Sequence, residues 1–326
     1  MAAMRSGMLR AGFMALSMTL ILTACGGGGG GGSSLSDTPL ERALAATPAN
    51  SESTTWWGFT DVAAIQKLGG FDKVTTPYGQ ASGYGYGSLA QYMRVIGDYL
   101  PSGSDPNATA VSYGQPPNTV IRLTGVADVD TTYGKLEGER SDLEGGTLLV
   151  RAEDHKIDPA DETFGAPIIG AFNTIWYDDD TVVTAGARRP VEDAVGNDGD
   201  SMRDAKAYQG VADCLGDAVA AQLASAKFAG APGNIAIGVR DDGEPTQVLC
   251  VSSDDPGDTA KVVEKNLESG TDKISLQAWS KVLKGAEVDT TDGWLRVTLT
   301  GDESPAIFYQ LLVRRGLPGL LQATNE

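Results

Sequence analysis

A succession of strand, helix, hairpin and helix patterns occurs twice along this chain and narrows the folds open to it. In the first half a strand pattern at 119–124 precedes a helical segment at 129–139, a hairpin at 174–185 and a helix that begins near Pro190. Hairpins join antiparallel neighbours, whereas a doubly wound parallel sheet needs strands that alternate with helices. We therefore expect an α+β fold of antiparallel sheets with helices packed on one face.

The second half repeats this order. A strand pattern at 247–252 is followed by a helix at 259–268, a hairpin at 286–300 and a helix that begins at Pro305. Proline suits the first turn of a helix, where its missing N–H costs nothing. The shared order predicts two related units from an internal duplication. Chance repetition of a common layout is the alternative.

The amino-acid composition around residues 204–233 predicts the boundary between these two units. An alanine-rich stretch at 204–226 favours a helix, and a Gly-Ala-Pro-Gly loop at 230–233 follows it. We therefore expect one α+β unit over residues 56–230 and a second over residues 231–326.

The N-terminus carries an export signal. Arg5 and Arg10 lie in the leading segment and an apolar run covers 11–22. A spanning helix needs about 20 apolar residues, so this run is too short to cross a bilayer. We expect residues 1–24 to direct export and then to be removed.

The residues Leu22-Thr23-Ala24-Cys25 close this segment and resemble the lipobox of bacterial lipoproteins. The resemblance implies diacylglyceryl transfer to the sulfur of Cys25, cleavage before it and often acylation of the new amino group, as with palmitate. It also implies a protein anchored by lipid to the extracytoplasmic face of the cell membrane. Several acyl chains at about 0.8 kcal/mol per buried methylene would make this anchor durable.

The body of the chain is similar to exported lipoproteins of high-GC Gram-positive bacteria. The similarity lies in the opening Gly58-Phe59-Thr60-Asp61 and in the abundance of alanine, glycine and aspartate. It implies no activity and assigns no catalytic residue.

Residues 25–55 have the composition of a tether. Seven glycines follow Cys25, and large apolar groups are few up to residue 55. About 30 such residues span roughly 30 Å on average, which would hold a domain away from the headgroups. We expect the stretch 40–46 to form only a transient helix within this tether.

The charge of the chain limits its partners. Removal of residues 1–24, which carry Arg5, Arg10 and no acidic residue, leaves 23 basic and 43 acidic residues, a net charge of −20. Such a charge repels phosphate backbones and anionic headgroups, so nucleic acid is excluded as a partner. An acidic surface that collects cations or a basic partner is the alternative, although the acidic residues are scattered.

Two cysteines remain once Cys25 is assigned to lipid. Cys214 lies in a helical stretch and Cys250 in a strand-like one. An even pair in an exported protein predicts a disulfide, and two unpaired buried thiols are the alternative.

Aromatic side chains are the binding candidates. Tyr84 and Tyr86 alternate with glycines in 83–87, so we expect their rings to project from a loop that could approach a flat ligand such as a sugar or an aromatic ring. Trp176, in the first hairpin, is a third candidate for the wall of a cleft. Packing of the rings into the core is the alternative.

The sequence carries no recognisable catalytic motif. His155 is the only histidine, and its charged surroundings indicate a surface loop. Asp178, Asp179 and Asp180 are read as turn-formers between two strands, and the acidic stretch 128–139 lacks the glycine that a calcium loop needs. We therefore expect no cofactor, no metal and no catalytic residue.

These observations favour a non-enzymatic binding or interaction role in the cell envelope. The partner would be the membrane through the anchor, together with an envelope protein or a small ligand. A solute-binding lipoprotein of an importer is one alternative, although such proteins usually alternate strands and helices in parallel order. A hydrolase that works with two carboxylates is the other.

Overall fold

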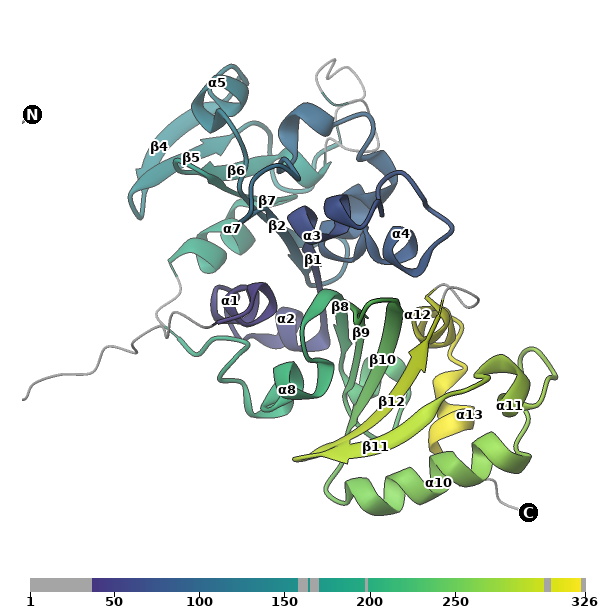
Figure 1. The fold of residues 1–326 in the computed structure, drawn as a ribbon. Helices are drawn as coiled ribbons and strands as arrows, with labels where there is room; N and C mark the ends of the chain where they lie inside the picture. The colour runs from purple at the N-terminus through teal and green to yellow at the C-terminus, as the bar shows by residue number, and fades with distance from the viewer. Residues whose placement is uncertain (1–36, 158–163, 165–169, 197–198, 302–305, 324–326) are drawn as a thin grey trace, which may run out of the picture. The chain divides into compact units, whose positions relative to one another are not determined.

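One sheet organises the chain. It belongs to a computed structural model that describes residues 37–157, 164, 170–196, 199–301 and 306–323 (Figure 1). Its strands are β1 (Trp56–Asp61), β2 (Thr109–Tyr113), β3 (Val120–Thr124), β4 (Glu139–Leu143), β5 (Gly146–Val150), β6 (Thr174–Tyr177), β7 (Thr181–Ala185), β8 (Ala218–Ala224), β9 (Ile235–Asp241), β10 (Pro245–Ser252), β11 (Glu287–Thr291) and β12 (Trp294–Thr300).

The order of these strands is β11-β12-β10-β9-β8-β1-β2-β3-β7-β6-β5-β4, and every neighbouring pair is antiparallel. The antiparallel α+β fold predicted from the hairpins is therefore confirmed. The sheet has two arms that meet where β1 pairs with β8. The boundary expected at residue 230 falls between β8 and β9, which are hydrogen-bonded neighbours inside one continuous sheet.

Both arms lay their strands down in the same order. Three consecutive strands pair side by side, and a hairpin then returns against the third, giving β1-β2-β3-β7-β6 on one arm and β8-β9-β10-β12-β11 on the other. The hairpin β4-β5 extends the first arm beyond β6. The helix expected at 129–139 accordingly ends early, at Tyr133, because the chain then turns into β4.

Helices and short 3-10 helices cover both faces of the sheet, not one face as expected. They are α1 (Pro39–Ala45), α2 (Ser51–Thr55), α3 (Val62–Lys67), α4 (Pro77–Ala81), η1 (Tyr84–Tyr92), η2 (Gly97–Tyr99), α5 (Val129–Tyr133), η3 (Gly170–Phe172), α7 (Arg188–Val195), η4 (Lys206–Tyr208), α8 (Val211–Leu215), α9 (Ala226–Ala229), α10 (Pro256–Ser269), α11 (Trp279–Val282), α12 (Ile307–Val313) and α13 (Leu317–Leu321).

One face of the sheet packs against α1, α7 and α8. Its core runs from Leu40 and Leu44 of α1 through Trp57 of β1 to Trp294 of β12. Cys214 of α8 and Cys250 of β10 are buried in this core, and their sulfur atoms lie 2.12 Å apart. The bonded pair agrees with the disulfide predicted from the sequence. It joins a helix to a strand across the second arm.

The opposite face carries a separate set of helices over each arm. Tyr86 and Leu89 of η1, with Val129 and Tyr133 of α5, cover the first arm. Helices α10 to α13 cover the second arm, where Trp279 is buried in a core shared with residues of β9, β10 and β12. The middle of this face, above β1 and β8, packs against η1, α3 and α4 through Tyr84, Ile65 and Tyr78.

Helix α1 corrects the expected extent of the tether. The Thr38 hydroxyl accepts the backbone N–H of Glu41 at 3.2 Å, and the Glu41 carboxylate accepts that of Thr38 at 2.7 Å, which is a capping box. Leu40 and Leu44 are each 1% exposed in the core. The helix is therefore part of the fold, because its apolar side is buried. A flexible tether can include only residues before 37.

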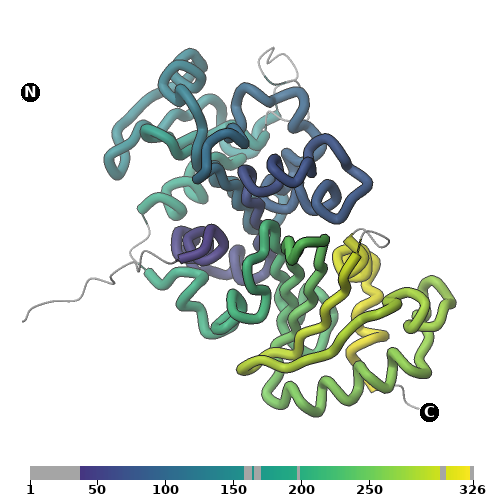
Figure 2. Tube along the Cα trace, viewed as in Figure 1, coloured from purple at the N-terminus to yellow at the C-terminus, as the bar shows by residue number. Residues whose placement is uncertain are grey.

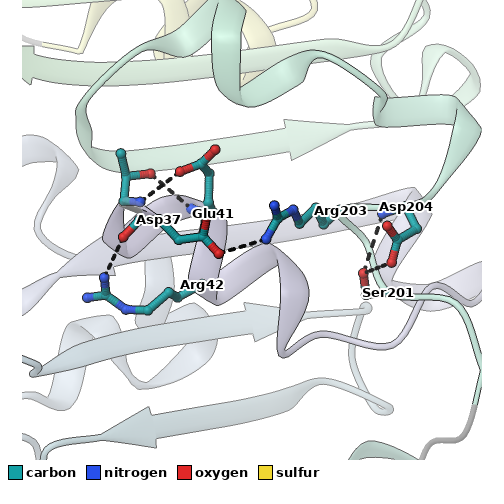
Figure 3. A network of polar contacts seen from close by, with 7 residues as sticks. Asp37, Glu41, Arg42, Ser201, Arg203 and Asp204 are labelled. Carbon is teal, nitrogen blue, oxygen red and sulfur yellow. Dashed lines mark hydrogen bonds and ion pairs between the residues drawn. The ribbon is translucent and has the colours of Figure 1, made fainter. Parts of the chain in front are cut away.

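Polar contacts also fasten this N-terminal stretch. Arg203 forms an ion pair with Asp37 at 2.8 Å, and Arg42 donates to the Asp37 carbonyl oxygen at 2.7 Å (Figure 3). Backbone bonds join residues 47–49 to 200–202. The purple start of the described trace lies against this green segment in Figure 2.

Strand β8 corrects the helix expected at 204–226. Helix α8 ends at Leu215, and residues 218–224 form a strand between β1 and β9. Strands with both faces covered read as continuous apolar runs without alternation, which is also how an alanine-rich helix reads. The helix was predicted from the high helix propensity of alanine. The hydrogen-bonded pairing on both sides of β8 overrides that preference.

Candidate functional site

A pocket of about 500 Å³ lies over the middle of the sheet on the face opposite α1. Its floor is made by β1, β2 and β8 through Trp56, Ser112 and Gln222. Its walls come from η1, from the loop 114–119 and from helices α9 and α12. The pocket thus occupies the place where the helices that cover the two arms meet.

Glycine residues let η1 lie directly on the sheet beside this pocket. A Cβ atom on Gly58 would lie 2.1 Å from the Tyr84 carbonyl oxygen, and one on Gly85 would lie 2.0 Å from that of Ala110. Such contacts are possible only without a side chain. The Ser112 hydroxyl donates to the Tyr84 carbonyl at 3.2 Å, and the Gly85 N–H donates to the Thr60 hydroxyl at 3.0 Å. This close approach fixes one wall.

Four aromatic rings line the pocket in two pairs. The Trp56 and Phe228 ring centroids are 4.9 Å apart, and those of Tyr84 and Tyr309 are 4.8 Å apart. Trp56, Phe228 and Tyr309 are half-buried, so part of each side chain is exposed. Each pair joins one residue of the first arm to one of the second. The pocket therefore exists only when both arms are folded.

Amides and hydroxyls supply the polar part of the wall. Gln222 is buried, and its amide nitrogen donates to the Trp57 carbonyl oxygen at 2.7 Å, which fixes the orientation of the side chain. Ser88, Gln115 and Thr119 also line the pocket. Their side chains form no hydrogen bond among the residues that the structure describes. These three groups are thus available to a ligand.

Among the described residues, no acidic or basic side chain lines this pocket, although the chain carries a net charge of −18. Burial raises the pKa of Tyr309, and burial together with the neighbouring Tyr309 raises the pKa of Tyr84. Both phenols therefore remain neutral at physiological pH and well above it. The site is electrically neutral and suited to an uncharged ligand.

The Tyr84 hydroxyl is an unusual group in this wall. It is buried and has no hydrogen-bond partner in the described part of the chain. A buried polar group without a partner costs about 1–3 kcal/mol, so native structures contain few of them. This hydroxyl lies at the junction between the arms, beside the pocket.

The structure corrects the expected exposure of the three aromatic candidates. Tyr84, Tyr86 and Trp176 are 6%, 1% and 5% exposed, so their rings do not project into solvent. The glycines between the tyrosines bring η1 onto the sheet, and this buries the rings instead of freeing them. The Trp176 indole N–H donates to the Leu143 carbonyl oxygen at 2.8 Å within the opposite core. Only Tyr84 of the three lines the central pocket.

The remaining sequence candidates fall outside this pocket. Asp178 accepts the backbone N–H groups of Asp180 at 3.2 Å and Thr181 at 2.8 Å, so the acidic run forms the turn that was predicted. His155 is exposed in a loop, also as predicted. Cys25 lies outside the described residues.

In the described ranges, no helix combines the length and apolar character needed to cross a bilayer. Within the same ranges, no group of three or more His, Cys, Asp or Glu side chains is arranged to hold a metal ion.

Comparison of the chain with protein-family models, with curated proteins and with solved structures finds no match. The geometry of the pocket is therefore the basis for a functional assignment.

Proposed function

We propose that this protein is a lipid-anchored extracytoplasmic binding protein that holds a small uncharged molecule in the central pocket. The observation that carries the binding role is a pocket of about 500 Å³ whose described lining has four aromatic rings and no acidic or basic side chain. Small-molecule sites are typically mostly apolar, with a few polar groups that fix the ligand's orientation. The role requires no catalysis and no cofactor. The duplicated α+β unit that we propose, supported by the shared strand order, would have created the pocket between its two copies.

The two alternatives from the sequence are weaker. An importer's solute-binding protein usually has strands in parallel order, and all pairings in this sheet are antiparallel. A carboxylate hydrolase would use a wider depression lined by Asp130, Asp142 and the turn 178–180. Asp178 is engaged in holding that turn, and no buried unpartnered polar atom of the described residues lies among these aspartates.

Anchoring is supported by the Leu-Thr-Ala-Cys sequence and is tested at Cys25. We expect the wild-type chain in the membrane fraction of its cells and in the detergent phase after partition. Cys25→Ala removes the sulfur that would carry diacylglycerol, so we expect this variant to shift out of the detergent phase. Unchanged partition of Cys25→Ala would contradict the anchor. A circular dichroism spectrum like that of the wild type would exclude unfolding as the cause.

Binding is tested with the uncharged fluorescent probe N-phenyl-1-naphthylamine, on a chain exported with a lipid-independent signal in place of residues 1–25. We expect saturable binding that Trp56→Ala weakens at least about tenfold, equivalent to about 1.4 kcal/mol of lost apolar contact. The matched control is Leu276→Ala, which also truncates a large apolar side chain. Leu276 is 80% exposed and lies outside the pocket, so this variant should leave probe binding unchanged.

The pH dependence of probe binding follows from the same site. Burial raises the pKa of Tyr309, and Tyr84 shifts in the same direction, so the neutral forms persist above the ordinary value of about 10. Because the described wall holds no other titratable side chain, affinity should vary less than about twofold from about pH 5 to about pH 9. A titration of affinity near neutral pH would contradict an uncharged pocket.

A further inference from the structure

We propose that the ligand of the central pocket is a neutral saccharide, with a sugar ring packed on the aromatic wall and its hydroxyls bonded to the amide and hydroxyl side chains. This rests on the proposed binding role and adds the chemical class of the ligand. Three features of the pocket carry it: the exposed parts of its aromatic residues, its unpaired polar groups and its neutrality.

The aromatic residues suit one face of a sugar ring. A pyranose has a face of C–H groups and a rim of hydroxyls, so it is apolar on one side and polar around its edge. Trp56 and Phe228 are half-buried, 4.9 Å apart and tilted by 59°, so they form an angled apolar wall with a share of its surface open. Tyr309 contributes a third partly exposed ring. A purely apolar ligand would use these rings alone.

The polar groups suit the rim of hydroxyls. Gln115 offers an amide donor and acceptor, and Ser88 and Thr119 offer hydroxyls that can donate or accept. None of these side chains is engaged by another described residue. Sugar hydroxyls are also donors and acceptors, so each can match such a group. A flat apolar ligand would leave all three unpaired, at a cost in affinity.

Neutrality and size set the limits of the class. The described residues of the wall offer no cation to pair with a phosphate, sulfate or uronic acid, and the chain's net charge of −18 repels them. The same residues offer no carboxylate to pair with an amino sugar or a polyamine. The volume of about 500 Å³ lies within the range of about 300–1,000 Å³ typical of small-molecule sites. A neutral mono- or disaccharide meets these conditions.

The test is isothermal titration calorimetry on the unlipidated, exported chain. The ligands are glucose, galactose, mannose, N-acetylglucosamine, maltose, lactose and glucuronic acid. We expect at least one neutral sugar to bind with a millimolar or lower Kd and glucuronic acid to bind at least tenfold more weakly. Trp56→Ala should weaken the sugar at least tenfold. Gln115→Met keeps the length of the side chain and removes its amide, so it should weaken the sugar five- to tenfold.

The matched control is Gln277→Met, at an exposed position outside the pocket, which should change neither ligand. If no neutral sugar binds at 50 mM while the naphthylamine probe binds through Trp56, the saccharide proposal fails and the binding role stands. If neither binds, both fail. Sugar binding that is insensitive to Trp56→Ala and Gln115→Met would also overturn the proposal, because the sugar would then occupy another site.

Discussion

The double variant Cys214→Ala/Cys250→Ala is expected to lose about 4 kcal/mol of unfolding free energy. The disulfide joins residues 36 positions apart, and the chain-entropy relation for a loop of this length gives a value of about this size. Both side chains are fully buried, so their replacement by alanine also removes packing from the core. For a domain whose stability is typically about 5–15 kcal/mol, this is a large fraction.

Guanidinium unfolding followed by circular dichroism measures this difference. The oxidised wild type should unfold at a clearly higher denaturant concentration than the double variant. Treatment with dithiothreitol provides the internal control, since it should lower the wild-type midpoint towards that of the variant and leave the variant unchanged. Equal midpoints for the oxidised wild type and the variant would mean that the bond adds no stability.

The disulfide also bears on the pocket. The loop that it closes contains β8, α9 and β9, and these elements carry Gln222 and Phe228. Loss of the disulfide should therefore increase the mobility of the pocket wall formed by β8 and α9 more than that of the wall formed by η1. Probe binding to the reduced protein should weaken before the first arm unfolds.

The fold could be read from the sequence where local signals and tertiary structure agree. The hairpin β11-β12 has a two-residue turn, Asp292-Gly293, with Gly293 at φ 73°, which is the conformation that favours glycine there. The pairing of Cys214 with Cys250 followed from an even count in an exported chain. The turn depends on the conformation of one glycine, and the disulfide depends on the reactivity of two cysteines. Both predictions therefore needed only a few residues.

Prediction failed where a segment's state is decided by its neighbours. Ala218–Ala224 has the composition of a helix, but it is a strand because β1 and β9 pair with it on both sides. Leu40 and Leu44 looked like isolated apolar residues in a tether, yet a core contributed by distant elements buries them. The residues within each segment do not indicate which distant elements will pair with it or bury it.

The pocket was the least predictable feature. Tyr84 was a candidate because glycines flank it, but Phe228 and Tyr309 lie on short helices of the other arm. Their approach follows from the pairing of β1 with β8, which joins residues more than 150 positions apart, as in the pair Gly58 and Gln222. A local sequence pattern does not indicate which distant strands pair. The pocket could therefore be identified only from the structure.

Gly58→Ala tests whether the close approach of η1 holds the pocket together, and we expect it to cost about 3 kcal/mol of stability, at the upper end for overpacking a core. The added Cβ would lie 2.1 Å from the Tyr84 carbonyl oxygen and 3.2 Å from the Gln222 amide oxygen. A backbone oxygen cannot rotate away as a flexible side chain can. Either η1 lifts from β1 or the central strand shifts.

Each response moves Tyr84 relative to Tyr309 and breaks the bond from the Ser112 hydroxyl to the Tyr84 carbonyl. Binding of N-phenyl-1-naphthylamine should therefore fall at least about tenfold at a temperature where the variant is still folded. Gly97→Ala is the matched control, because a Cβ there meets nothing within 4 Å. It should change stability by no more than about 0.5 kcal/mol and leave binding intact. Wild-type stability and binding in Gly58→Ala would show that η1 can leave the sheet freely, and the wall of the pocket would then need another support.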